Sequence, residues 1–209
     1  MKIKELTPKV QAVYDAVEAY YREGTDLNSL TVAEITGRAG IGKGTAYDYF
    51  SNKEDMIANA LFYKISQICT QINLRMQKEK SLSTKIKLIL MEMEHQLAET
   101  DCLFRAIHIM SGDTEIGKRL QEMEKNKREE EIMPMDLIRY IVQDGLADRE
   151  KPGQETLDYL SLDIFSKILC YGMFLHDNSF LHTRNNENMQ KMVCEGILRE
   201  VEAVTASLA

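Results

Sequence analysis

A short stretch of donor and aromatic side chains lies between Gly42 and Lys53 of this 209-residue chain. Lys43 can donate to guanine O6 or N7, and the methyl and hydroxyl groups of Thr45 can meet a thymine methyl or a phosphate. Tyr47 can pack its ring on a sugar and donate its hydroxyl hydrogen to a phosphate oxygen. These are the contacts that proteins make with duplex DNA. The candidate chemistry is therefore non-covalent recognition of nucleic acid.

Further residues of this region suit particular roles at a duplex. Gly44 lets the backbone come close to the DNA, and Asp48, a poor partner for phosphate, either accepts from cytosine N4 or, as we favour, points away. Lys53 starts the next helix, where its charge adds to free N–H groups and the helix dipole to hold a phosphate. Thr31 is placed similarly at the start of an earlier helix. The DNA-contact candidates are therefore Thr31, Lys43, Gly44, Thr45, Tyr47, Asp48, Tyr49 and Lys53.

Two short helices joined by a tight turn would position these side chains. Thr31 can cap the first helix while Glu34, three residues later, bonds back to the capping backbone, which makes a capping box. Gly40 supplies the turn, because glycine takes the positive φ that strains a residue with a Cβ. The second helix is about two turns long, and we expect Ile35 and Phe50 to lie in the core. This arrangement is a helix-turn-helix.

The stretch closely resembles the DNA-binding signature of the tetracycline-repressor (TetR) family of bacterial transcription regulators. In that signature a small residue, Lys, Gly, Thr, an apolar residue, Tyr and a Tyr-Phe pair precede a Lys-Glu. The matching residues are Gly42, Lys43, Gly44, Thr45, Ala46, Tyr47, Tyr49 with Phe50, and Lys53 with Glu54. Upstream, Thr7 and Pro8 open a helix that Gly24 ends, which matches the family's first helix. The remainder of the chain resembles the family in length and helical pattern.

The Gly-Lys-Gly-Thr segment is unlike a phosphate-binding loop of a nucleotide-hydrolysing protein. Such a loop needs a first glycine several residues earlier, a preceding strand, and a Ser or Thr directly after the lysine. In this chain Gly44 follows Lys43, and a helix precedes them. The chain also has no nucleophile elbow, Cys-His signature, metal-ligand spacing or cofactor-binding loop. We therefore expect no enzyme activity, no cofactor and no metal.

The composition is that of a globular protein, with 44% hydrophobic and 28% charged residues. No apolar run approaches the roughly 20 residues that cross a bilayer, and the N-terminus lacks the apolar core of a signal peptide. We therefore expect a cytoplasmic protein that does not bind a membrane. The cysteines, Cys69, Cys102, Cys170 and Cys194, lie far apart without a CxxC spacing, as expected of free thiols in a reducing compartment.

The net charge of −7 argues against a protein that coats nucleic acid. Residues 1–53 hold seven basic and seven acidic side chains, so the negative excess lies in the remainder. A neutral DNA-binding region depends on a few well-placed phosphate contacts, and its affinity falls steeply as salt is raised. Lys2, Lys4 and Lys9 either form an arm that touches DNA or belong to a frayed terminus.

The pattern beyond residue 53 predicts helices throughout, because prolines are rare and apolar residues recur at a spacing of about 3.6. A proline inside a helical pattern disrupts it, so we expect Pro134 to kink or interrupt a polar helix. A long helix is expected over 53–77, and a second helix begins after a cap at Ser83 or Thr84. A short helix follows at about 101–110, and a polar helix before Pro134 includes the run EKNKREEE. The last two expected helices span about 154–176 and the residues after a loop at 177–186.

The predicted fold is all-α, with a three-helix DNA-binding domain at 1–53 and a helical ligand-binding and dimerisation domain at 54–209. The helix over 154–176 has apolar residues on more than one face. The resemblance implies that the two C-terminal helices meet their twofold mates as a four-helix bundle, so we expect a homodimer. A dimer also suits the DNA, since two recognition helices about one helical turn apart read a palindromic operator.

The resemblance further implies a small-molecule pocket in the body, whose ligand changes the spacing of the recognition helices and lowers operator affinity. The candidates for its walls are His95, Phe104, His108, Tyr171 and Phe174. The expected function is thus a ligand-responsive transcription regulator, most often a repressor in this family. The alternative is a ligand-independent DNA-binding protein on the same scaffold that organises the chromosome or recruits a partner.

Overall fold

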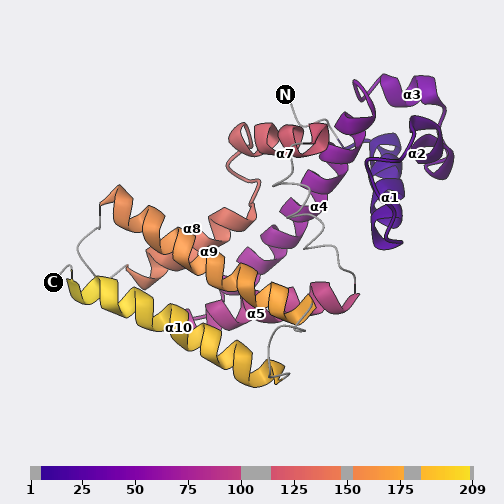
Figure 1. Ribbon diagram of the computed structural model, residues 1–209. Coiled ribbons are helices and arrows are strands. Elements are labelled where there is room, and N and C mark those ends of the chain that lie inside the picture. Colours follow the sequence, from indigo (N-terminus) through magenta and orange to yellow (C-terminus); the bar gives the residue numbers. More distant parts are fainter. Residues whose placement is uncertain (1–5, 100–113, 147–152, 177–184, 208–209) are drawn as a thin grey trace. The chain divides into compact units, whose positions relative to one another are not determined.

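The computed structural model describes residues 6–99, 114–146, 153–176 and 185–207, which form helices and turns with no strand among them (Figure 1). The helices are α1 (Pro8–Arg22), α2 (Val32–Arg38), α3 (Lys43–Tyr47), α4 (Lys53–Met76), α5 (Leu82–Glu99), α7 (Glu115–Lys125), α8 (Pro134–Gly145), α9 (Gln154–His176) and α10 (Asn186–Ser207). The predicted all-α fold is confirmed. The helix expected over 101–110 lies outside the described residues.

The chain folds as two compact units. Unit 1 comprises Met1–Gln67 and Thr100–Glu131, and unit 2 comprises Ile68–Glu99 and Ile132–Ala209. Unit 1 therefore holds α1, α2, α3, the first part of α4, and α7, whereas unit 2 holds the rest of α4 with α5, α8, α9 and α10. The predicted functional boundary between residues 53 and 54 stays a prediction.

An apolar core joins α1, α2, α3 and the start of α4 in unit 1. Thr7 caps α1 by accepting a hydrogen bond from Val10 N at 3.3 Å, and Pro8 occupies the first turn, as predicted. Ile35 and Phe50 are buried in this core, which confirms their predicted place. Its buried apolar side chains include Val10, Val13, Val17, Leu27, Leu30, Ile35, Ala46, Phe50, Met56 and Ile57.

Helix α7 ends at Lys125, whereas we expected a polar helix that included the whole run EKNKREEE. Asn126 is its C-cap, and the Glu131 carboxylate accepts from the Arg128 backbone N–H at 2.8 Å and from the Arg128 guanidinium. These bonds stabilise a turn in place of further helix. Pro134 does not kink α7 but begins α8, because its fixed φ and missing N–H suit a first helical turn.

Helices α5, α8, α9 and α10 pack together in unit 2. Helix α5 starts earlier than expected, because Ser81 Oγ, and not Ser83 or Thr84, accepts the backbone N–H of the first turn at 3.1 Å. The buried Lys85 amine pairs with Asp144 at 2.8 Å and so joins α5 to α8. The apolar core includes Ile86, Leu90, Leu137, Ile141, Leu160, Ile164, Ile168, Ile197 and Val201.

Three cysteines lie within the described residues, and each is a free thiol, as the sequence predicts. Cys69 and Cys194 are buried and Cys170 is exposed, whereas Cys102 lies outside the described ranges. Across the same described ranges, no helix combines the length and the apolar character that a membrane span requires.

Candidate DNA-binding site

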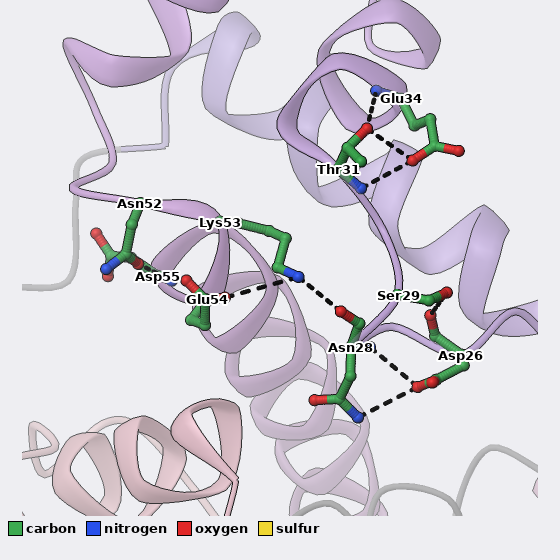
Figure 2. Close-up of polar contacts among 9 residues, drawn as sticks. All are labelled: Asp26, Asn28, Ser29, Thr31, Glu34, Asn52, Lys53, Glu54 and Asp55. Carbon is green, nitrogen blue, oxygen red and sulfur yellow. Dashed lines mark hydrogen bonds and ion pairs between the residues drawn. The ribbon is translucent and has the colours of Figure 1, made fainter.

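The predicted capping box at the start of α2 is present (Figure 2). Thr31 Oγ1 accepts from Glu34 N at 3.3 Å, and Glu34 Oε2 accepts from Thr31 N at 2.8 Å and from the Thr31 hydroxyl at 2.7 Å. The hydroxyl bond and then the backbone bond hold the pKa of Glu34 below its ordinary value. Thr31 is exposed, but its hydroxyl is bonded to Glu34, so its contact with DNA stays a prediction.

A glycine in the left-handed region ends α2, as predicted. Gly40 has φ +67°, its N–H donates to Gly37 O at 3.3 Å, and the next N–H, of Ile41, donates to Thr36 O at 3.1 Å. This pair of bonds is a Schellman motif, in which glycine avoids the strain of a Cβ. The turn fixes the direction in which the chain enters α3.

Helix α3 presents most of the predicted contact residues on its outer surface. Lys43, Gly44, Tyr47 and Asp48 are exposed, with Tyr47 52% exposed, whereas Ala46 is fully buried. The helix itself is five residues long, which is shorter than the expected two turns. A turn continues from it, because the N–H groups of Tyr49 and Phe50 both donate to Ala46 O.

Two of the predicted contact residues, Thr45 and Tyr49, are half-buried. The fully buried Ala46 and the buried Phe50 anchor this segment on the core of unit 1. The outer surface of α3 can therefore meet DNA without breaking the contacts that hold the helix. That each of these residues touches DNA stays a prediction.

Lys53 is engaged within the protein (Figure 2). Its Nζ donates to Asn28 O at 2.6 Å and lies 3.6 Å from Glu54 Oε1. Asp26 Oδ1 shapes the same loop by accepting from Asn28 N at 3.0 Å and from Asn28 Nδ2 at 3.2 Å. The Lys53 amine therefore ties the start of α4 to the loop before α2, and its predicted phosphate contact would have to share that amine.

Sequence reasoning missed the buried carboxylate of Asp55. Asp55 is 2% exposed, and its Oδ2 accepts from Ser51 N at 2.8 Å and from Ser51 Oγ at 3.0 Å. Asn52 Oδ1 in turn accepts from Asp55 N at 2.9 Å. The spacing of Asn52 and Asp55 before an apolar run was the available signal, because it is the spacing of a capping box.

Acidic neighbours hold several basic side chains of unit 1. Arg38 donates to both carboxylate oxygens of Glu23, at 2.7 and 2.5 Å, and its guanidinium lies 4.5 Å from the centre of the Tyr20 ring. Within the described residues Lys43 has no such acidic partner. It is therefore the cation of α3 that is available for a base edge or a phosphate.

Two of the predicted ligand-pocket residues lie together in unit 2. Tyr171 and Phe174 are buried on α9 with stacked rings whose centres are 6.3 Å apart. The Tyr171 hydroxyl donates to Glu94 Oε1, which also accepts from Gln190 Nε2 at 3.0 Å. Burial, and then the bond to Glu94, raises the pKa of Tyr171.

The places of the other pocket candidates in such a pocket stay predictions. His95 is exposed on α5, next to Glu94 in the sequence. Phe104 and His108 lie outside the described residues. Glu94 and Gln190 were missed because only the tertiary structure brings α5, α9 and α10 together.

The helix-turn-helix also matches a known sequence family. Residues 16–60 match the family described as bacterial regulatory proteins, tetR family. Over 151 residues the chain is 24% identical to the fatty acid metabolism regulator protein of Bacillus subtilis (strain 168). The aligned residues cover 71% of this chain and 73% of that protein.

Solved structures share the fold over nearly the whole chain. The FadR regulator of Bacillus subtilis in complex with stearoyl-CoA has a TM-score of 0.67 and 18% identity, covering 90% of this chain and 97% of that one. FadR of Bacillus halodurans has a TM-score of 0.66 and 21% identity, covering 93% and 97%. A putative regulator from Pseudomonas aeruginosa PAO1 has a TM-score of 0.68 and 13% identity, covering 100% and 99%. The helix-turn-helix over residues 16–60 therefore matches the tetR family of bacterial regulatory proteins, and the chain shares the all-helical fold of these solved structures.

Proposed function

We propose that the chain is a repressor that binds a palindromic operator as a homodimer and leaves it when a small ligand binds unit 2. The exposed side chains of α3 carry this proposal, because Lys43 and Tyr47 stand outward while Ala46 beneath them is buried. A helix of five residues reads only a few base pairs. Two copies are therefore needed for a site of useful specificity.

Exposed apolar side chains on the C-terminal helices support the homodimer. On α9, Tyr159, Leu162 and Met173 are 54%, 65% and 46% exposed, and Met192 on α10 is 63% exposed. Apolar surface of this kind on neighbouring helices is typical of a protein interface. A second copy related by a twofold axis would cover it with the same residues. Light scattering at micromolar concentration without DNA should therefore give twice the chain mass, and a monomer would contradict the proposal.

The relatives suggest a class of ligand. One is named as a fatty acid metabolism regulator, and the FadR structure from Bacillus subtilis holds stearoyl-CoA. We therefore propose a long-chain acyl-CoA as the first ligand to test.

Selection from a random duplex library tests the DNA-binding proposal. The wild-type chain should enrich a palindrome, and Tyr47→Ala should lose it, because the ring and hydroxyl proposed to contact the backbone are removed. Lys125→Gln, at an exposed position of α7, is the control and should enrich the same palindrome. A wild-type chain that enriches nothing at low salt would contradict the proposal.

Release from the selected operator tests the ligand proposal. Stearoyl-CoA should lower operator affinity, whereas free CoA and stearate, which each supply one half of the molecule, should have much weaker effects. If stearoyl-CoA and a broad panel of other small molecules all leave affinity unchanged, the ligand-independent DNA-binding protein becomes the better hypothesis.

A further inference from the structure

The buried Asp55 carboxylate fixes the backbone directly after the helix-turn-helix. Its Oδ2 holds the N–H and hydroxyl of Ser51, and its Oδ1 accepts from the buried Asn59 Nδ2 at 2.8 Å. Ser51 follows Phe50, whose ring is 1% exposed in the core of unit 1. The position of Asp55 therefore sets the connection between α3 and α4.

Aromatic packing shows that this connection is a junction of several elements. The Tyr14 ring of α1 lies 6.2 Å from the Phe50 ring and 5.2 Å from the Tyr63 ring of α4, measured between ring centres. Burial, and then the negative charge of Asp55, raises the pKa of Tyr14. Helix α1, the end of the helix-turn-helix and the start of α4 thus meet around the Asp55 carboxylate.

A cation from a distant part of the sequence reaches this carboxylate. Arg119, on α7 of the same unit, places its Nη1 3.8 Å from Asp55 Oδ1, and its side chain is only 23% exposed. The separation is too long for a hydrogen bond but short enough for strong attraction where water is largely excluded. Arg119 Nε is buried without a hydrogen-bond partner among the described residues. The guanidinium has therefore lost hydration that no hydrogen bond at Nε replaces, which costs free energy.

The apolar face of α7 accounts for its attachment to unit 1 but not for this arginine. Ile116, Leu120 and Met123 are buried, and Thr114 caps the helix by accepting from Gly117 N at 3.1 Å. These apolar contacts and the cap attach α7 to unit 1 without using the side chain at position 119. Among the described residues the acidic partner of Arg119 is Asp55, which accounts for a cation at this position.

We infer that Arg119 is a positioning residue for DNA binding, which holds Asp55 and through it the Ser51 turn that orients α3. The inference rests on the proposed DNA-binding function and deepens it, because it makes α7 a necessary part of the DNA-reading unit. Operator affinity then depends on a residue that does not touch DNA.

The test uses the full chain and the operator selected by the wild type. Arg119→Gln should weaken operator binding about tenfold, and Arg119→Lys, which keeps the charge, should recover part of the loss. The control Lys125→Gln removes a cation from an exposed position of the same helix and should bind as the wild type does. Stoichiometric titration gives the active fraction of each variant, so that a folding defect is separated from a change in Kd.

Salt dependence distinguishes positioning from direct contact. A phosphate-contacting arginine would reduce the slope of log affinity against log salt by about 1 when it is removed, whereas Arg119→Gln should leave the slope unchanged. In an Asp55→Asn background the same substitution should have a much smaller effect, because its partner charge is gone.

Three results would overturn the inference while leaving the proposed function intact: an affinity of Arg119→Gln within twofold of the wild type, a reduced salt slope, or an undiminished loss in the Asp55→Asn background. A loss confined to the active fraction would likewise assign Arg119 a purely structural role. A wild-type chain that binds no duplex would overturn the proposed function, and this inference with it.

Discussion

Units 1 and 2 are both helical, but different features of the sequence specify them. In unit 1 only a few residue types suit each critical backbone position: Thr31 and Glu34 begin α2, and Gly40 ends it. In unit 2 the helices are held by interchangeable aliphatic side chains around Leu160 and Ile197. A family signature can therefore persist in unit 1, while unit 2 keeps its fold as its sequence changes. The family model fits this account, because its match covers residues 16–60 of unit 1.

Truncation in the core of unit 2 is the largest perturbation that this comparison predicts. Leu160 is fully buried, so Leu160→Ala should lower the free energy of unfolding by about 2–5 kcal/mol. Leu160→Met keeps the volume and should cost less than about 1.5 kcal/mol, because aliphatic residues are exchangeable there. Urea unfolding measures both. If methionine costs as much as alanine, unit 2 is as strictly specified as unit 1.

A glycine test in unit 1 should show the opposite behaviour. Gly40→Ala places a Cβ at φ +67° with no atom within 4 Å of it, so the expected cost of about 1–2 kcal/mol is purely conformational. Gly37→Ala is the matched control, because this glycine lies within α2 and also has open space around it. The control should stabilise by about 0.5–1 kcal/mol. Thermal unfolding of the two variants should therefore shift in opposite directions, and equal shifts would remove the special role of Gly40.

The same contrast explains what the sequence could predict. The capping box at Thr31, the turn at Gly40 and the helix over 154–176 depend on residues close in the chain, and each was predicted correctly. The early end of α7 was missed because the Glu131 carboxylate captures Arg128, which helix periodicity does not reveal.

Contacts between distant residues could not be predicted from the sequence. Asp55 meets Arg119 across 64 positions, and Tyr171 meets Glu94 across 77. No local pattern encodes such pairs, because tertiary packing alone creates them. The exposed face of α3 was predictable in outline, whereas the bond from Lys53 to Asn28 O, 25 residues away, was not.

Gly44→Ala separates stability from function within α3. Gly44 is exposed in the helix with no atom within 4 Å of an added Cβ, so alanine should stabilise unit 1 by about 0.5–1 kcal/mol. The same methyl group would stand between the backbone and the DNA and should lower operator affinity by about tenfold, equivalent to about 1.4 kcal/mol. Thermal unfolding and operator titration measure the two effects. An unchanged affinity would mean that the backbone of α3 does not closely approach the duplex.

Acid titration of the capping box is the smallest expected effect and the most local. The Thr31 hydroxyl and N–H hold the pKa of Glu34 below its ordinary value of 4.5, so the ionised carboxylate contributes stability above that pH and loses it as pH falls through the lowered pKa. Glu34→Gln keeps a neutral acceptor at the same position. The wild type should therefore unfold at a higher temperature than Glu34→Gln at neutral pH, and the difference should shrink as the solution is acidified below pH 4.5. Glu122→Gln, on the exposed side of α7, controls for the loss of one negative charge. A difference that stays constant on acidification would mean that the neutral amide and the neutral acid cap α2 differently, and that the charge of Glu34 does not stabilise the cap.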